Sequence, residues 1–116
     1  MESPAFQDRE EVERALGAPR FLIFKHSLIC PVSERAFSRY LAFLETHPQT
    51  PTAWVDVIGQ RPLSQHIAAR TGITHASPQA IVVIDGTPAW NASHDAITVE
   101  ALDLALRTRE SANDPR

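Results

Sequence analysis

Several features are scarce in this sequence of 116 residues, and each scarcity excludes a class of protein. A single cysteine cannot form an internal disulfide, so its thiol is available for chemistry. The longest apolar runs, 21–24 and 80–84, fall far short of the ~20 residues that a membrane span needs, so no membrane partner is expected. The first four residues lack the basic and apolar stretches of a secretory signal, which favours a cytoplasmic protein.

Charge gives no sign of nucleic-acid binding. The formal net charge is −3, and no basic cluster is interleaved with aromatic residues, so we expect no nucleic-acid partner. Lys25 is the only lysine. It is either a solvated strand end or a cation that draws an anion or a thiolate to a nearby site. With 43% hydrophobic residues, the chain has enough apolar material for the core of one domain.

Apolar spacing and turn residues predict alternating helices and strands. Asp8 is a plausible cap for the first helix, Asp85-Gly86 is typical of a tight hairpin, and Pro88 favours an edge position for the last strand. The helices are expected at 8–16, 31–46, 61–70 and 98–108, and the strands at 20–24, 52–58, 79–84 and 89–92.

This order predicts the α/β, thioredoxin-like layout, a four-stranded mixed sheet flanked by helices. The strand at 20–24 is apolar throughout, which is typical of a central strand buried on both faces. Strand, helix and strand then form a right-handed parallel crossover. We therefore expect one domain over residues 1–116, of which 110–116 form a polar tail.

Cys30 falls where the first strand runs into a helix. Unpaired N–H groups and the positive end of the helix dipole stabilise a thiolate there, and Pro31 fits the first helical turn. A lone cysteine can also be a small buried core residue. Ser33 occupies the position of the second cysteine in dithiol motifs, so a mixed disulfide at Cys30 must be released by another thiol. The Ser33 hydroxyl either donates towards the thiolate or caps the first turn.

Pro78 lies just before a strand, in a connection that this layout places opposite the cysteine. There the Ser77–Pro78 bond is expected to be cis and to present backbone groups to a bound adduct. A trans proline in an ordinary turn is the alternative.

Taken together, several segments resemble the monothiol bacilliredoxins (the YtxJ family). The resemblance spans 21–106, and Ile29 departs from it because the family typically has threonine before the cysteine. The matching segments are Lys25-His26-Ser27, Cys30-Pro31-Val32-Ser33, Arg61-Pro62-Leu63-Ser64, His75-Ala76-Ser77-Pro78-Gln79, Asp85-Gly86, Trp90, Ala92-Ser93-His94 and Ile97-Thr98.

The resemblance implies a thiol-disulfide oxidoreductase that removes bacillithiol from S-bacillithiolated proteins through a mixed disulfide at Cys30. Bacillithiol would be a co-substrate, with no bound cofactor, and Pro31 and Ser33 would shape the thiol's surroundings. The thiol carries two malate carboxylates and a sugar, so the resemblance implies binding by the cationic and polar residues Lys25, His26, Ser27, His75 and Gln79, and by backbone groups that Ser77 and Pro78 present to the adduct.

Other interpretations remain open. His26 and His75 can instead be loop histidines bonded to backbone, while Trp90 and His94 are interpreted as structural. Histidine and cysteine spacing predicts no metal site. The alternative functions are an iron–sulfur carrier of the monothiol glutaredoxin type and a non-catalytic thioredoxin-like binding module.

Overall fold

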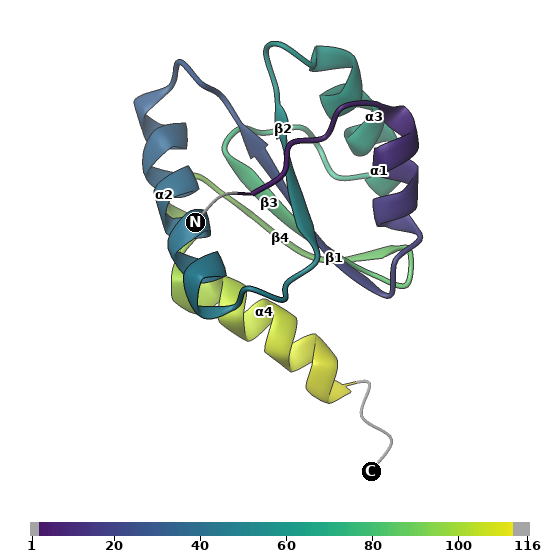
Figure 1. The fold of residues 1–116 in the computed structure, drawn as a ribbon, viewed down its shortest axis with the longest axis vertical. Coiled ribbons are helices and arrows are strands. Elements are labelled where there is room, and N and C mark those ends of the chain that lie inside the picture. The colour runs from purple at the N-terminus through teal and green to yellow at the C-terminus, as the bar shows by residue number, and fades with distance from the viewer. Residues whose placement is uncertain (1–2, 113–116) are drawn as a thin grey trace.

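The structure is a computed structural model that describes the backbone of residues 3–112 and the side chains of residues 3–107. Helices and strands alternate along the chain before a terminal hairpin and helix (Figure 1). The helices are α1 (Arg9–Leu16), α2 (Pro31–Thr46), α3 (Arg61–Thr71) and α4 (Val99–Ala112), with a short 3-10 helix, η1 (His94–Ala96). The strands are β1 (Arg20–His26), β2 (Thr52–Asp56), β3 (Gln79–Ile84) and β4 (Thr87–Ser93).

The four strands form one mixed sheet in the order β2-β1-β3-β4. β1 runs parallel to β2 and antiparallel to β3, and β3 and β4 form an antiparallel hairpin. Helices α2 and α4 cover one face, and α1 and α3 cover the other (Figure 1). This arrangement confirms the predicted thioredoxin-like layout, including the central position of β1 and the edge position of β4.

Local signals fix several boundaries as expected. The Asp8 carboxylate accepts the N–H of Glu11 at 3.0 Å and so caps α1. Gly72 ends α3 with φ +73°, a left-handed conformation in which glycine has no Cβ penalty. Asp85 and Gly86 both have positive φ, as a two-residue hairpin turn between β3 and β4 requires.

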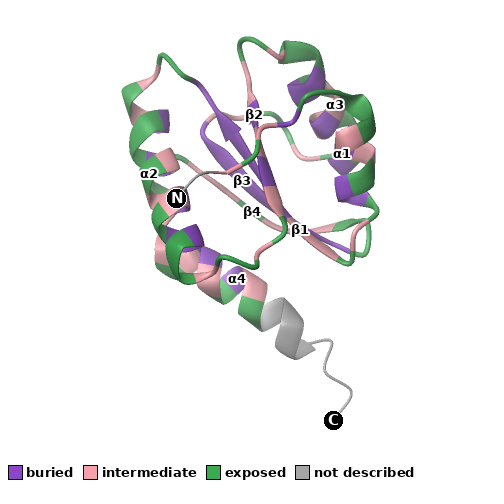
Figure 2. Cartoon of the chain, viewed as in Figure 1, coloured by how far each residue is buried: buried purple, intermediate pink, exposed green. Residues whose placement is uncertain are grey.

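The core has two parts, one on each face of the sheet. Alternate residues of β1 point to opposite faces, so Leu22 and Phe24 pack towards α2 and α4 while Ile23 packs towards α1 and α3. The strands β1 and β3 are the most deeply buried part of the chain (Figure 2). By the same alternation, Lys25 faces α3 and His26 faces α2.

Four predicted boundaries were wrong by two residues or more. β1 continues to His26 because its last residues pair with both β2 and β3. β2 ends at Asp56, whose carboxylate accepts the N–H groups of residues 58 and 59 and closes a turn. β4 begins at Thr87 and includes Pro88, beside an irregularity in the ladder. α4 continues to Ala112, so 110–112 of the predicted tail are helical, and 113–116 lie outside the described residues.

The segment before α1 covers the outer edge of β2, which the sequence did not predict. Ala5 forms a parallel bridge with Trp54, whose N–H donates to the Pro4 carbonyl at 3.0 Å. The Trp54 carbonyl accepts the N–H of Phe6 at 2.8 Å. These bonds satisfy backbone groups that an open edge would leave free for another chain.

Candidate active site

Cys30 is the N-cap of α2, and its side chain is half-buried. Its backbone is extended, its carbonyl accepts the N–H of Glu34 at 3.0 Å, and its side chain makes no capping bond. Pro31 begins the helix, as expected. The interpretation of Cys30 as a buried core residue is therefore wrong, because the sulfur lies at a helix N-terminus and within reach of solvent.

The Ser33 hydroxyl is fully buried and ties the start of α2 to the segment before it. Its Oγ accepts the N–H of Ser27 at 2.8 Å and lies 2.7 Å from Nδ1 of His26. Ser33 therefore neither bonds the Cys30 sulfur nor caps the first turn, and both predicted roles for this hydroxyl are wrong. Its hydrogen bonds fix residues 26 and 27, which precede Cys30, to the first turn of α2.

His26 supports this arrangement from β1. Its ring is 1% exposed, stacks on Phe37 with centroids 4.2 Å apart, and has Nε2 3.8 Å from a carboxylate oxygen of Glu34. Burial lowers the pKa of His26, against the opposing charges of Glu34 and Asp56. A neutral ring accepts the Ser33 proton at Nδ1 and keeps its own at Nε2. The prediction of a backbone-bonded loop histidine was wrong.

Lys25 lies on the other face of the sheet and is completely buried. Its Nζ is 3.1 Å from Nδ1 of His75, and Ser64 Oγ of α3 lies 3.1 Å from the same nitrogen. No carboxylate pairs with Lys25 among the residues that the structure describes. The interpretation of Lys25 as a solvated strand end is wrong because α3 and the following loop cover its ammonium group.

Burial acts on both members of this pair. It lowers the pKa of Lys25 to about 8. It also lowers the pKa of His75, and the charges of Lys25 and Arg61 lower it further. At neutral pH, Lys25 is therefore mostly charged and His75 is neutral. The partners of His75 are side chains, so its prediction as a backbone-bonded histidine was also wrong.

The loop before β3 contains His75 and lies at the end of the sheet where β1 leads to Cys30. The Ser77–Pro78 bond is cis, as predicted. Gln79 is 3% exposed and pairs with Lys25 in the β1–β3 register. The Oγ of Ser77 and the Oε1 of Gln79 are buried without a hydrogen-bond partner. The carboxyl end of β1, which leads to Cys30, and the start of β3 thus lie at the same end of the sheet.

Sequence reasoning assigned no role to Ser64, which contacts His75. Ser64 was part of a matching segment but had no assigned role, and only the packing of α3 brings it to His75. His94, interpreted as structural, begins η1, and its backbone N–H donates to the Pro78 carbonyl at 3.1 Å, which agrees with that interpretation. His94 is exposed and has φ +56°, a left-handed conformation unusual for a residue with a Cβ. No local sequence signal would have indicated either contact.

Three exposed apolar side chains lie in the segments that follow β1 and β2. Leu28 and Ile29 are 59% and 81% exposed and immediately precede Cys30. Ile58, which follows β2, is 50% exposed. Because β1 and β2 are parallel, their carboxyl ends meet at one edge. Exposed apolar side chains thus directly precede Cys30 in the chain, and the polar Lys25–His75 pair lies at the carboxyl end of β1, the strand that leads to Cys30.

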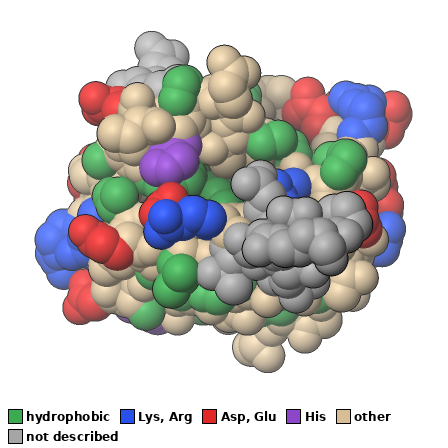
Figure 3. Space-filling view, turned by 90° about the horizontal axis from the view of Figure 1, so that it is seen from below, with side chains coloured by type: hydrophobic (Ala, Val, Ile, Leu, Met, Phe, Trp, Pro, Cys, Tyr) green, Lys and Arg blue, Asp and Glu red, His purple; other side chains and the backbone are tan. Residues whose placement is uncertain are grey.

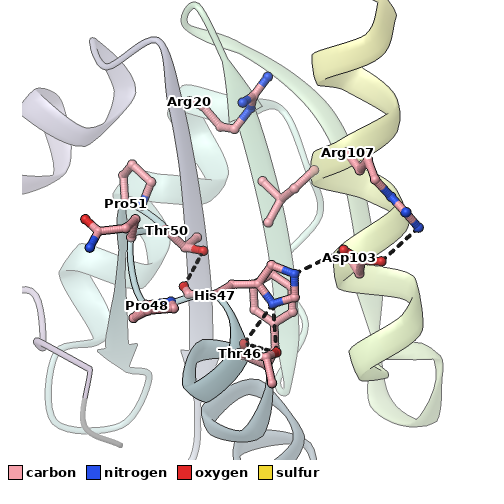
Figure 4. Close-up of a pocket in the computed structure, with 11 residues that line it drawn as sticks. Arg20, Thr46, His47, Pro48, Thr50, Pro51, Asp103 and Arg107 are labelled. Carbon is pink, nitrogen blue, oxygen red and sulfur yellow. Dashed lines mark hydrogen bonds and ion pairs between the residues drawn. The ribbon is translucent and has the colours of Figure 1, made fainter.

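A separate cavity of about 500 Å³ lies at the opposite end of the sheet (Figure 4). There Asp103 of α4 contacts His47 at 3.1 Å and Arg107 at 2.9 Å. Figure 3 views this end of the molecule and shows acidic and basic side chains interspersed. The cavity holds no thiol and is not part of the cysteine site. It is lined by Arg20, Phe43, Thr46, His47, Pro48, Gln49, Thr50, Pro51, Asp103, Leu106 and Arg107.

Within the described part of the chain, no group of three or more histidine, cysteine, aspartate or glutamate side chains is placed to hold a metal ion. None of the described helices is long and apolar enough to span a membrane.

Solved structures agree with this geometry. A thioredoxin-fold protein described as a candidate oxidoreductase superposes with a TM-score of 0.83 at 28% identity, over 90% of this chain and 93% of that one. An oxidised thioredoxin from Plasmodium falciparum gives a TM-score of 0.71 at 14% identity, over 93% and 98% of the two chains. Mitochondrial thioredoxin 3 from Saccharomyces cerevisiae gives 0.70 at 15% identity, over 91% and 94%.

Fold and site together define a thioredoxin-fold protein with a single thiol at the start of α2. The family model for monothiol bacilliredoxin BrxC matches residues 5–102. The chain therefore belongs to the monothiol bacilliredoxin family, as its sequence motifs indicated.

Proposed function

We propose that this protein is a thiol-disulfide oxidoreductase that removes bacillithiol from S-bacillithiolated proteins in the cytoplasm. The observation that carries the proposal is the place of Cys30, the only cysteine, at the N-cap of α2 with its side chain unbonded and half-buried. Helix N-termini stabilise the thiolate, which is the attacking form of cysteine. Membership of the bacilliredoxin family supports bacillithiol as the co-substrate.

The reaction needs one exchange and one release. The Cys30 thiolate attacks the bacillithiol sulfur of a mixed disulfide, the old S–S bond breaks, and the substrate cysteine leaves as a thiolate that takes a proton from water. Cys30 is then bonded to bacillithiol. A second bacillithiol thiolate attacks that bacillithiol sulfur, releasing oxidised bacillithiol and the Cys30 thiolate. Without a second cysteine, no internal disulfide can form, so an external thiol or a partner reductase must complete the cycle.

The surrounding residues prepare the thiol and its partner. Pro31 fixes the first turn of α2, and the bonds of Ser33 to Ser27 and His26 hold the segment before Cys30 in place. The backbone of Ser77, the residue before Pro78, would pair with the adduct in the manner of an added strand, since the Pro78 carbonyl already accepts the N–H of His94. Exposed Leu28 and Ile29 offer apolar surface to a substrate protein.

Turnover on a bacillithiolated protein tests this proposal. The wild type is expected to release the bacillithiol label with multiple turnovers when free bacillithiol is present, and Cys30→Ser is expected to release none. Serine is a good N-cap, so Cys30→Ser should retain the wild-type melting temperature. Release of the label by Cys30→Ser at the wild-type rate would refute the catalytic role.

A different result would support one of the alternatives. An iron–sulfur carrier would show visible absorption from a cluster when isolated without oxygen, which the proposed oxidoreductase does not predict. An unreactive Cys30 in an otherwise folded protein would favour a binding module.

A further inference from the structure

The Lys25–His75 pair fixes which nitrogen of His75 carries the proton. A lysine ammonium group has three donors and no acceptor. Its Nζ is 3.1 Å from Nδ1 of His75, so Nδ1 must be the acceptor. A neutral imidazole with an accepting Nδ1 has its proton on Nε2. His75 is neutral because burial and the charges of Lys25 and Arg61 lower its pKa.

The Nε2–H of His75 is therefore a hydrogen-bond donor beside the carboxyl end of β1, the strand that leads to Cys30. His75 is exposed, whereas Lys25 behind it is completely buried and has no carboxylate partner among the described residues. A buried charge without a counter-ion is unfavourable unless an anion balances it. The positive charge polarises the imidazole and strengthens its Nε2–H as a donor to an anion.

Two polar side-chain atoms close in sequence to His75 lack hydrogen-bond partners. The Oε1 of Gln79 is buried and unbonded, while the Nε2 of the same side chain donates to the carbonyl of Thr74, next to His75, at 3.1 Å. The Ser77 Oγ is buried and unbonded as well. Buried polar atoms are rarely left unsatisfied, so these two, one in the loop before β3 and one at the first residue of β3, show that the polar groups beside Lys25 and His75 are not all paired within the protein.

We propose that the Nε2–H of His75 binds a carboxylate of the low-molecular-weight thiol in the mixed disulfide, and that buried Lys25 is a positioning residue acting through His75. The ligand class is a thiol that carries a carboxylate together with hydroxyl or amine donors. This inference rests on the proposed function and changes the role expected of Lys25, which contacts His75 rather than the ligand.

The test compares two substrates that share one peptide. One carries bacillithiol, which is anionic, and the other carries 2-mercaptoethanol, which is uncharged, each in a mixed disulfide. His75→Ala is expected to raise KM for the bacillithiol substrate about tenfold, the effect of losing one hydrogen bond to a charged group, and to leave KM for the uncharged substrate within about twofold. Lys25→Met should act in the same selective way, with a smaller change.

His66→Ala is the matched control. His66 is another histidine, on α3, where it bonds Glu13 at 2.6 Å. Its removal should leave KM for both substrates unchanged. Equal effects of His75→Ala on both substrates, or no effect on either, would overturn the inference while wild-type turnover would still support the proposed function. Failure of the wild type to turn over either substrate would overturn both.

A second readout does not depend on activity. Nitrogen-15 spectra of the wild type at pH 7 are expected to show His75 with its proton on Nε2 alone. In Lys25→Met, which removes the only obligatory donor to Nδ1, a mixture of both tautomers is expected. A proton on Nδ1 in the wild type, or an unchanged tautomer in Lys25→Met, would contradict the positioning role.

Discussion

Replacing Lys25 with methionine should stabilise the protein at neutral pH. Burial lowers the pKa of Lys25 from 10.5 to about 8. Between these values the unfolded chain keeps a proton that the folded chain has lost, so the free energy of unfolding rises with pH in this window. The full difference of about 2.5 pH units corresponds to about 3 kcal/mol. Below pH 8 the folded protein carries all of this penalty, and above pH 10.5 it carries none.

Methionine removes the penalty and also the bond to His75, which is worth about 1 kcal/mol. We therefore expect Lys25→Met to be more stable than the parent by about 2 kcal/mol at pH 7. Between pH 7 and pH 9.5 the parent should gain about 2 kcal/mol and the variant almost nothing. The ionisation of Tyr40 does not affect stability between pH 7 and pH 9.5. Burial raises its pKa to about 12, so its contribution to the pH dependence of stability begins above pH 10.

Urea denaturation followed by tryptophan fluorescence measures these differences. Both proteins should carry Cys30→Ser, so that oxidation of the thiol does not affect the comparison. Parallel curves of stability against pH, or a Lys25→Met protein less stable than its parent at pH 7, would refute the reasoning. A confirmed stabilisation would mean that the natural residue weakens the fold, which is expected of a charge retained for function.

Three further predictions concern the caps and the thiol. Asp8→Ala should lower the free energy of unfolding by about 1 kcal/mol without changing turnover, since it removes the cap of α1; unchanged urea midpoints would count against this. Gly72→Ala should cost about 1 kcal/mol for conformational reasons alone, because φ is +73° and no atom lies within 4 Å of an added Cβ; calorimetry measures it, and an unchanged melting temperature would contradict it. Ser33→Cys should shorten the life of the bacillithiol adduct by adding a resolving thiol near Cys30; decay of the adduct mass at the wild-type rate would oppose this.

Local features could be predicted from the sequence because their causes lie within a few residues. The Asp8 cap, the Asp85-Gly86 hairpin and the position of Cys30 at a helix start depend on short-range chemistry. The mixed four-stranded sheet, with its first strand in the centre, could be predicted from the alternation of elements, the handedness of crossovers and the apolar run at 20–24. The expectation of a cis Ser77–Pro78 bond came from the same thioredoxin-like layout.

The remaining parts of the site depend on contacts between distant segments. Lys25 is buried because α3 and its following loop, about 40 to 50 residues further on, cover it. His94 reaches the Pro78 carbonyl only because β4 pairs with β3. The hydroxyl of Ser33 bonds residues that precede α2 rather than residues within it, because β1 places His26 beside it. None of these contacts leaves a local pattern.

The central claim is that Cys30 exchanges with bacillithiol and holds it. Intact mass spectrometry after exposure to oxidised bacillithiol tests this most directly, with oxidised glutathione in a parallel sample and Cys30→Ser as the control. We expect one bacillithiol to be added to the wild type, less glutathione to be added at the same concentration, and neither to be added to Cys30→Ser. A wild type that never accumulates the bacillithiol adduct, or that prefers glutathione, would contradict it.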